Sequence, residues 1–115
     1  MMWFSDEMVA LLNDLAPHVV VIGSVARGAR NPGDLDLLFN GDSEHACKRM
    51  RNIVDKHDLR WESALVHSWT FEDYGTQVEI LPLHLGPSWH VVRRNAEKHT
   101  INGIELMVAK PEHSG

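Results

Sequence analysis

Two aspartates one residue apart, Asp34 and Asp36, interrupt an apolar segment that ends at Phe39. Side chains alternate between the two faces of a strand, so both carboxylates would point the same way while Leu35 and Leu37 point into a core. Two carboxylates about 4 Å apart repel each other by roughly 4 kcal/mol at an effective dielectric constant near 20. The pattern therefore predicts that a divalent cation, in the first place Mg²⁺, offsets the repulsion.

A break in an earlier apolar run supplies a second feature. The β-branched run Val19–Ile22 predicts a buried strand that ends at Gly23 and Ser24. We expect a short helix from Ser24 to Arg30, ended by the turn signal Asn-Pro-Gly. Backbone N–H groups at such a turn attract anions, and glycine lets a phosphate approach the backbone closely. With the Ser24 hydroxyl and the guanidinium groups of Arg27 and Arg30 as further donors, the segment predicts a phosphate-binding loop.

A third acid, Glu79, lies inside another apolar segment, 77–84, that we expect to form a strand. Its carboxylate could deprotonate an acceptor hydroxyl or bridge a second metal ion. Each of these candidates has a plainer alternative. The two aspartates could lie on a solvated strand edge, Glu79 on the exposed face of an antiparallel strand, and the arginines in solvent.

Helical and strand-like patterns alternate along the rest of the chain, which predicts an α+β domain with a small mixed or antiparallel sheet. The expected helices begin at Ser5, at Ser43 (ending near His57) and at Pro87; the further expected strand covers 65–71, and Asn102-Gly103 marks a hairpin. A length of 115 residues fits one domain, 1–115, with one core.

Composition excludes several classes of protein. The net charge of −5 argues against non-specific binding along a nucleic-acid duplex. Cys47 is the single cysteine, which rules out an intramolecular disulfide and fits a reducing compartment. No apolar run approaches the roughly 20 residues that span a bilayer, and the first residues lack the pattern of a signal peptide. We therefore expect a cytoplasmic protein without membrane association.

The segment IGSVARGARNPGDLDL, from Ile22 to Leu37, resembles the signature of the DNA polymerase beta-like nucleotidyltransferase superfamily. That signature is an apolar residue, Gly, Gly or Ser, a spacer of about ten residues, and then acid–apolar–acid. Here nine residues separate Ser24 from the first aspartate. The sequence SVARG is most similar to the small, standalone or minimal members. The chain differs in having Gly33 where the family often has Ser, and Glu79 where Asp is commoner.

The resemblance implies a nucleotidyltransferase fold, with helices packed on one face of the sheet, and a Mg²⁺-dependent enzyme. Such an enzyme moves a nucleoside monophosphate from a nucleoside triphosphate to a hydroxyl and releases pyrophosphate. Gly23 and Ser24 would contact the triphosphate. Asp34 and Asp36 would bind two Mg²⁺ ions, with Mn²⁺ as a substitute, and Glu79 would supply the third carboxylate for metal binding and catalysis.

The resemblance leaves the acceptor open: a partner protein such as a toxin, an RNA end such as that of tRNA, or a small molecule. A homodimer or a partner protein could supply further binding surface. The alternative function is a non-catalytic, antitoxin-type binding module of the same fold that acts by occluding a partner protein.

Overall fold

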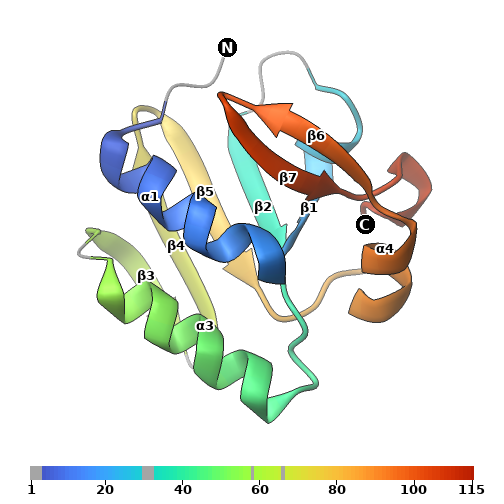
Figure 1. Cartoon of the computed structure of the whole chain (residues 1–115), viewed down its shortest axis with the longest axis horizontal. Coiled ribbons are helices and arrows are strands. Elements are labelled where there is room, and N and C mark those ends of the chain that lie inside the picture. Colours follow the sequence, from blue (N-terminus) through green and yellow to red (C-terminus); the bar gives the residue numbers. More distant parts are fainter. Residues whose placement is uncertain (1–3, 30–32, 58, 66) are drawn as a thin grey trace.

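A seven-stranded mixed sheet organises the chain, with strand order β3-β4-β5-β2-β1-β7-β6 (Figure 1). The computed structural model describes residues 4–29, 33–57, 59–65 and 67–115. The elements are α1 (Asp6–Leu15), the 3₁₀ turn η1 (Ala16–His18), β1 (Val20–Ile22), α2 (Gly23–Ala26), β2 (Asp34–Leu38), α3 (Glu44–Lys56), β3 (Trp61–Leu65), β4 (Ser68–Asp73), β5 (Thr76–Leu81), α4 (Trp89–Asn95), β6 (Glu97–Ile101), β7 (Ile104–Val108) and the 3₁₀ turn η2 (Pro111–His113).

The sheet is mixed because two of its pairings are parallel. β1 runs parallel to β7 and β2 runs parallel to β5, while the other neighbouring strands are antiparallel. This confirms the expected α+β class and the mixed sheet. Within the described ranges, no helix is both long enough and apolar enough to cross a membrane.

The two longer helices lie on the same face of the sheet (Figure 1). Both start at a predicted serine cap: Ser5 Oγ accepts from the Met8 N–H at 3.0 Å, and Ser43 Oγ accepts from the Ala46 N–H at 3.1 Å. Their buried side chains follow helical spacing and are Met8, Leu11, Leu12 and Leu15 in α1 and Cys47, Met50 and Val54 in α3. Burial of these apolar stripes fixes both helices on the sheet.

The hairpin between β6 and β7 has the predicted Asn-Gly turn. Asn102 and Gly103 both have positive φ, 49° and 83°, between β6 and β7. Tyr74 and Gly75, with φ of 48° and 79°, make the same kind of turn between β4 and β5. Two consecutive positive-φ residues match the right-handed twist of the strands that they join, which is why Asn-Gly pairs mark hairpins.

Several expected boundaries are wrong. The strand expected over 77–84 ends at Leu81, and the helix expected from Pro87 begins at Trp89. The single strand expected over 65–71 is two strands, β3 and β4, because β3 is an edge strand whose residues are mostly exposed and therefore lack an apolar signature. The helix expected from Ser24 to Arg30 covers only Gly23–Ala26, and Arg30 lies outside the described residues.

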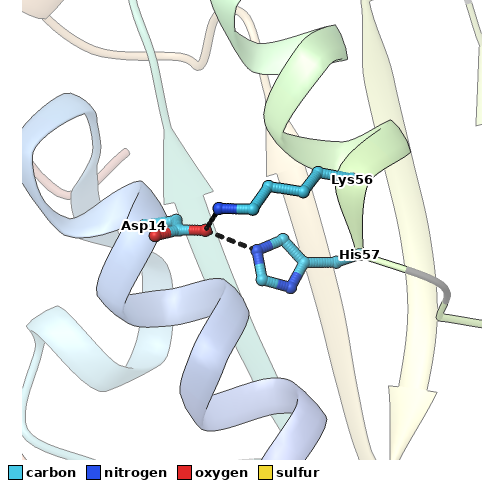
Figure 2. Close-up of polar contacts among 3 residues, drawn as sticks. All are labelled: Asp14, Lys56 and His57. Carbon is cyan, nitrogen blue, oxygen red and sulfur yellow. Dashed lines mark hydrogen bonds and ion pairs between the residues drawn. The ribbon is translucent and has the colours of Figure 1, made fainter.

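A cluster of polar side chains joins α1 to the end of α3 (Figure 2). His57 Nε2 and Lys56 Nζ lie 2.6 Å and 3.1 Å from the same oxygen, Asp14 Oδ2. The hydrogen bond with His57, followed by the one with Lys56, lowers the pKa of Asp14 below its usual value. Because the Asp14 side chain is partly exposed, we assign the cluster an orienting role for the two helices and little net stability.

The two faces of the central strands differ in burial. Leu35 and Leu37 of β2 and Val78 and Ile80 of β5 are fully buried in the core. Residues that alternate with these side chains point to the other face and are exposed or half-buried: Asp34, Asp36, Gln77 and Glu79. The acidic side chains therefore lie on the face of the sheet opposite to α1 and α3.

Asp73 has a structural role that the sequence does not reveal. Its Oδ2 accepts from the Ser5 backbone N–H at 2.9 Å and so ties the start of α1 to the end of β4. Because Asp73 is buried, its loss would leave the Ser5 N–H without this charged acceptor. We expect Asp73→Ala to lower the free energy of unfolding by about 1–3 kcal/mol in urea denaturation. The exposed neighbour Glu72 is the control, and an equal loss in Glu72→Ala would contradict this role.

Candidate functional site

The three predicted acids lie on two neighbouring strands at the centre of the sheet. β2 and β5 pair in parallel, with Asp36 opposite Glu79 and Asp34 opposite Gln77. Directly opposed residues point to the same face, and Asp34 lies two positions before Asp36 on that face. The register therefore brings Asp34, Asp36 and Glu79 together, although Glu79 belongs to a distant part of the sequence.

The predicted phosphate loop reaches the same place through β1. Ile22 pairs with Asp36 in the antiparallel β1–β2 ladder, so Gly23 follows directly beside that carboxyl group. Gly23 has φ of +72°, and a Cβ atom at this position would overlap Oδ2 of Asp36. Glycine is required here both by the left-handed backbone and by the close approach. The Gly-Ser break and the two aspartates are thus parts of one site.

The Asp36 carboxyl group has an unfavourable environment for negative charge. Burial, a hydrogen bond with Glu79 and the charges of Glu79 and Asp34 together raise the pKa of Asp36 to about 6, while Arg27 acts in the opposite direction. Within the described ranges, the buried Oδ1 of Asp36 has no hydrogen-bond partner. A shared proton, or a cation, relieves the repulsion between two such carboxylates. The carboxylates of the site therefore repel one another, and a bound cation would reduce this repulsion.

The other predicted anion-binding residues have different surroundings. Ser24, the second residue of α2, is half-buried, and its carbonyl oxygen accepts from the Ala29 N–H at 3.0 Å. Arg27 is the C-cap residue that follows α2, and its Nη1 donates to Ser114 Oγ at 3.2 Å and to the Gly115 main-chain oxygen at 3.1 Å. No feature of the sequence pointed to residues 114–115 as neighbours of the site, because contacts this distant in the chain leave no local pattern.

The acids of this site could supply only part of the ligands that a magnesium ion needs. Among the described residues, no group of three or more His, Cys, Asp or Glu side chains is arranged to enclose a metal ion. Mg²⁺ commonly takes only one or two carboxylates from the protein and completes its shell with substrate phosphates and water. The unpartnered Oδ1 of Asp36, beside Asp34 and Glu79, fits this shared type of coordination.

A separate hollow lies between α1 and α3, on the opposite face of the sheet. Its volume is about 620 Å³. The side chains around it are mainly basic or polar: Asp14, His18, His45, Lys48, Arg49, Asn52, Ile53 and Lys56. Its one acid, Asp14, already contacts Lys56 and His57, so this hollow lacks the opposed carboxylates that the sheet provides. We therefore take the acidic face of the sheet as the candidate site.

Comparison of the chain with protein families, with curated proteins and with solved structures finds no match.

The raised pKa of Asp36 predicts how stability depends on pH. Between about pH 4 and pH 6 the folded protein keeps a proton that the unfolded chain has released, so stability falls as the pH rises through this window and stays lower above it. Asp36→Asn removes the charge, and we expect it to raise stability at pH 7.5 by on the order of 1 kcal/mol, after allowance for partial exposure.

The measurement is thermal unfolding of wild type and Asp36→Asn between pH 3.5 and 8. Their melting temperatures should converge at the acid end, where wild-type Asp36 is protonated in both states. Asp42→Asn, at an exposed turn position, is the control and should shift the curve little. A constant difference across the whole pH range would show that the charge of Asp36 is not the cause.

Alanine substitutions at two glycines can distinguish the effect of backbone conformation from that of the contact with Asp36. Gly23 and Gly28 both have positive φ, +72° and +82°, but only at Gly23 would an added Cβ meet the Asp36 carboxyl group; at Gly28 it meets nothing within 4 Å. Both alanine variants should lose about 1–2 kcal/mol from the left-handed backbone. We expect Gly23→Ala to lose measurably more in urea denaturation, and Asp36→Ala in the same chain to recover most of the excess. Equal losses for the two glycines would contradict the close approach.

Proposed function

We propose that this protein is a Mg²⁺-dependent nucleotidyltransferase, which transfers a nucleoside monophosphate from a nucleoside triphosphate to a hydroxyl and releases pyrophosphate. The observation that carries the proposal is the contact between a positive-φ glycine and one of two opposed strand carboxylates, Asp36 and Glu79. Phosphate binding and carboxylate chemistry are needed at the same place for this reaction, and Gly23 and Asp36 are direct neighbours.

The loop residues bind and orient the triphosphate in this proposal. The Gly23 N–H, the Ser24 hydroxyl and the Arg27 guanidinium donate hydrogen bonds to the phosphate oxygens. The pairing of Ile22 with Asp36 supports this role, because a triphosphate held at the loop would lie beside Asp36. Orientation of this kind lowers the barrier by converting an encounter between molecules into a reaction within one complex.

The three carboxylates have different roles in the proposed reaction. Asp34 and Asp36 would hold Mg²⁺ together with the substrate phosphates, and Glu79 would contribute to the same site. When bound, the ion supplies positive charge that stabilises the negative charge developing on the phosphate oxygens. In this proposal Glu79 accepts the proton of the acceptor hydroxyl, and its position beside Asp36 on the open face of the sheet supports this role.

The alternative is a non-catalytic binding module of the antitoxin type that occludes a partner protein. It uses the same surface without transfer of a nucleotide. The two functions make opposite predictions for variants of the acids: loss of the carboxylates removes the activity of an enzyme, but a module that acts by occlusion should still bind and neutralise its partner.

Transfer of an α-phosphorus label tests the proposal directly. The protein is incubated with Mg²⁺ and each α-labelled nucleoside triphosphate in a lysate of its own host. We expect a labelled product whose formation falls at least about 100-fold in Asp34→Ala, Asp36→Ala and Glu79→Ala, because each removes charge at the reacting phosphate. The size of the labelled species gives the class of acceptor.

Glu72→Ala is the matched control, because Glu72 is an exposed acid of β4 outside the opposed pair. Its transfer rate should equal that of wild type. Unchanged transfer in Asp36→Ala would refute the mechanism, and absence of label with every nucleotide would favour the occluding module.

A further inference from the structure

The segment that follows β7 returns to the phosphate loop. β7 runs parallel to β1, and the Ala109 N–H donates to the Val21 carbonyl oxygen at 2.9 Å. The turn η2 then brings Ser114 alongside the start of α2, where its carbonyl oxygen accepts from the Gly23 N–H at 3.0 Å. The segment thus extends along β1 until it reaches the loop that we assign to the triphosphate.

Residues 114–115, here called the latch, take up the donors of that loop. Arg27 Nη1 donates to Ser114 Oγ at 3.2 Å and to the Gly115 main-chain oxygen at 3.1 Å. Together with the Gly23 N–H, both a backbone donor and a guanidinium donor are engaged by oxygen atoms of the latch. These oxygens lie where phosphate oxygens would need to lie in order to accept from the same groups.

The latch is itself held by a compact local structure. Ser114 is buried, its Oγ donates to the Pro111 carbonyl oxygen at 2.8 Å, and its N–H donates to the same oxygen at 3.3 Å. Gly115 lies against the ring of His84, so closely that a Cβ on Gly115 would be 2.9 Å from His84 Nδ1. The latch is therefore packed in a defined position between the phosphate loop and the segment that contains His84.

We propose that the latch and the triphosphate group of a nucleotide compete for the Gly23 N–H and for Arg27, so that the latch closes the site until a triphosphate displaces it. This inference rests on the proposed function, because it assumes that the loop binds phosphate. The hydroxyl and carbonyl oxygens of Ser114 are neutral, whereas a triphosphate offers charged oxygens, and hydrogen bonds to charged acceptors are about twice as strong. We therefore expect the triphosphate to displace the latch. Because the latch must first open, the apparent dissociation constant for the triphosphate is higher than it would be for a site that is always open.

The test uses Mg²⁺ with inorganic tripolyphosphate, a probe that needs no choice of base. Amide hydrogen exchange is measured by NMR on the wild-type chain at the Ser114 N–H and the Gly23 N–H, for which the proposal predicts different results. On binding, we expect the Ser114 N–H to exchange at least about tenfold faster, because the latch opens. The Gly23 N–H should stay protected, because a phosphate oxygen replaces the Ser114 carbonyl oxygen as its acceptor.

A pair of serine variants gives a second, independent measurement. Ser114→Ala removes the hydroxyl that accepts from Arg27 and should tighten tripolyphosphate binding about threefold to tenfold, the effect of one hydrogen bond on the closed state. Ser88→Ala is the matched control, because the Ser88 side chain makes no capping bond to α4. Its dissociation constant for tripolyphosphate should equal that of wild type.

The outcomes separate the latch from the proposed function. Tripolyphosphate binding with unchanged exchange at Ser114 overturns the latch and leaves the phosphate loop intact. Equal affinity in wild type and Ser114→Ala, with both variants folded by their melting temperatures, also overturns the latch. Failure of wild type and Ser114→Ala alike to bind tripolyphosphate overturns the phosphate loop itself, and with it both the latch and the proposed function.

Discussion

The parallel pairing of β2 with β5 is the constraint on which the rest of the structure depends. It places Asp36 opposite Glu79 and, on the other face, aligns Leu37 with Ile80 in the core. These two arrangements are linked because successive side chains along a strand point to opposite faces of the sheet. A shift of the strand register by one residue would bring the carboxylates into the core and the leucines into solvent. The hydrophobic core therefore determines the geometry of the acids, and no contact among the acids is needed to set it.

Much of this arrangement follows from local patterns in the sequence. The serine caps of α1 and α3, the Asn-Gly hairpin and the alternation around Asp34 and Asp36 all depend on neighbouring residues, and each predicted the observed element. The gathering of Asp34, Asp36 and Glu79 was a hypothesis from acids that interrupt apolar segments, to which the resemblance was added, since their spacing alone does not give the pairing of strands. The register of β2 and β5 supports that expectation, while the activity remains a proposal.

What could not be predicted depends on contacts between distant residues or on exposed elements. β3 is exposed along most of its length, so its residues carry no apolar periodicity that would separate it from a loop. Asp73 is acidic and lies at a turn, a position typical of solvent, yet it caps the start of α1 through the Ser5 N–H. The contact of Arg27 with Ser114 joins residues 87 positions apart, a distance over which sequence patterns carry no information.

The parallel pairing of β1 with β7 also affects how the sheet can form during synthesis of the chain. β1, near the start of the chain, is central in the sheet, but its second neighbour is the last strand. Contacts of such large sequence separation require a long loop to close, which slows their formation. During synthesis, a ribosome-bound chain that has exposed Asp34, Asp36 and Glu79 still has β1 unpaired on one side. The loop that begins at Gly23 then lacks the support of β7 beside β1, so its position becomes fixed only after β7 has been made and has paired with β1.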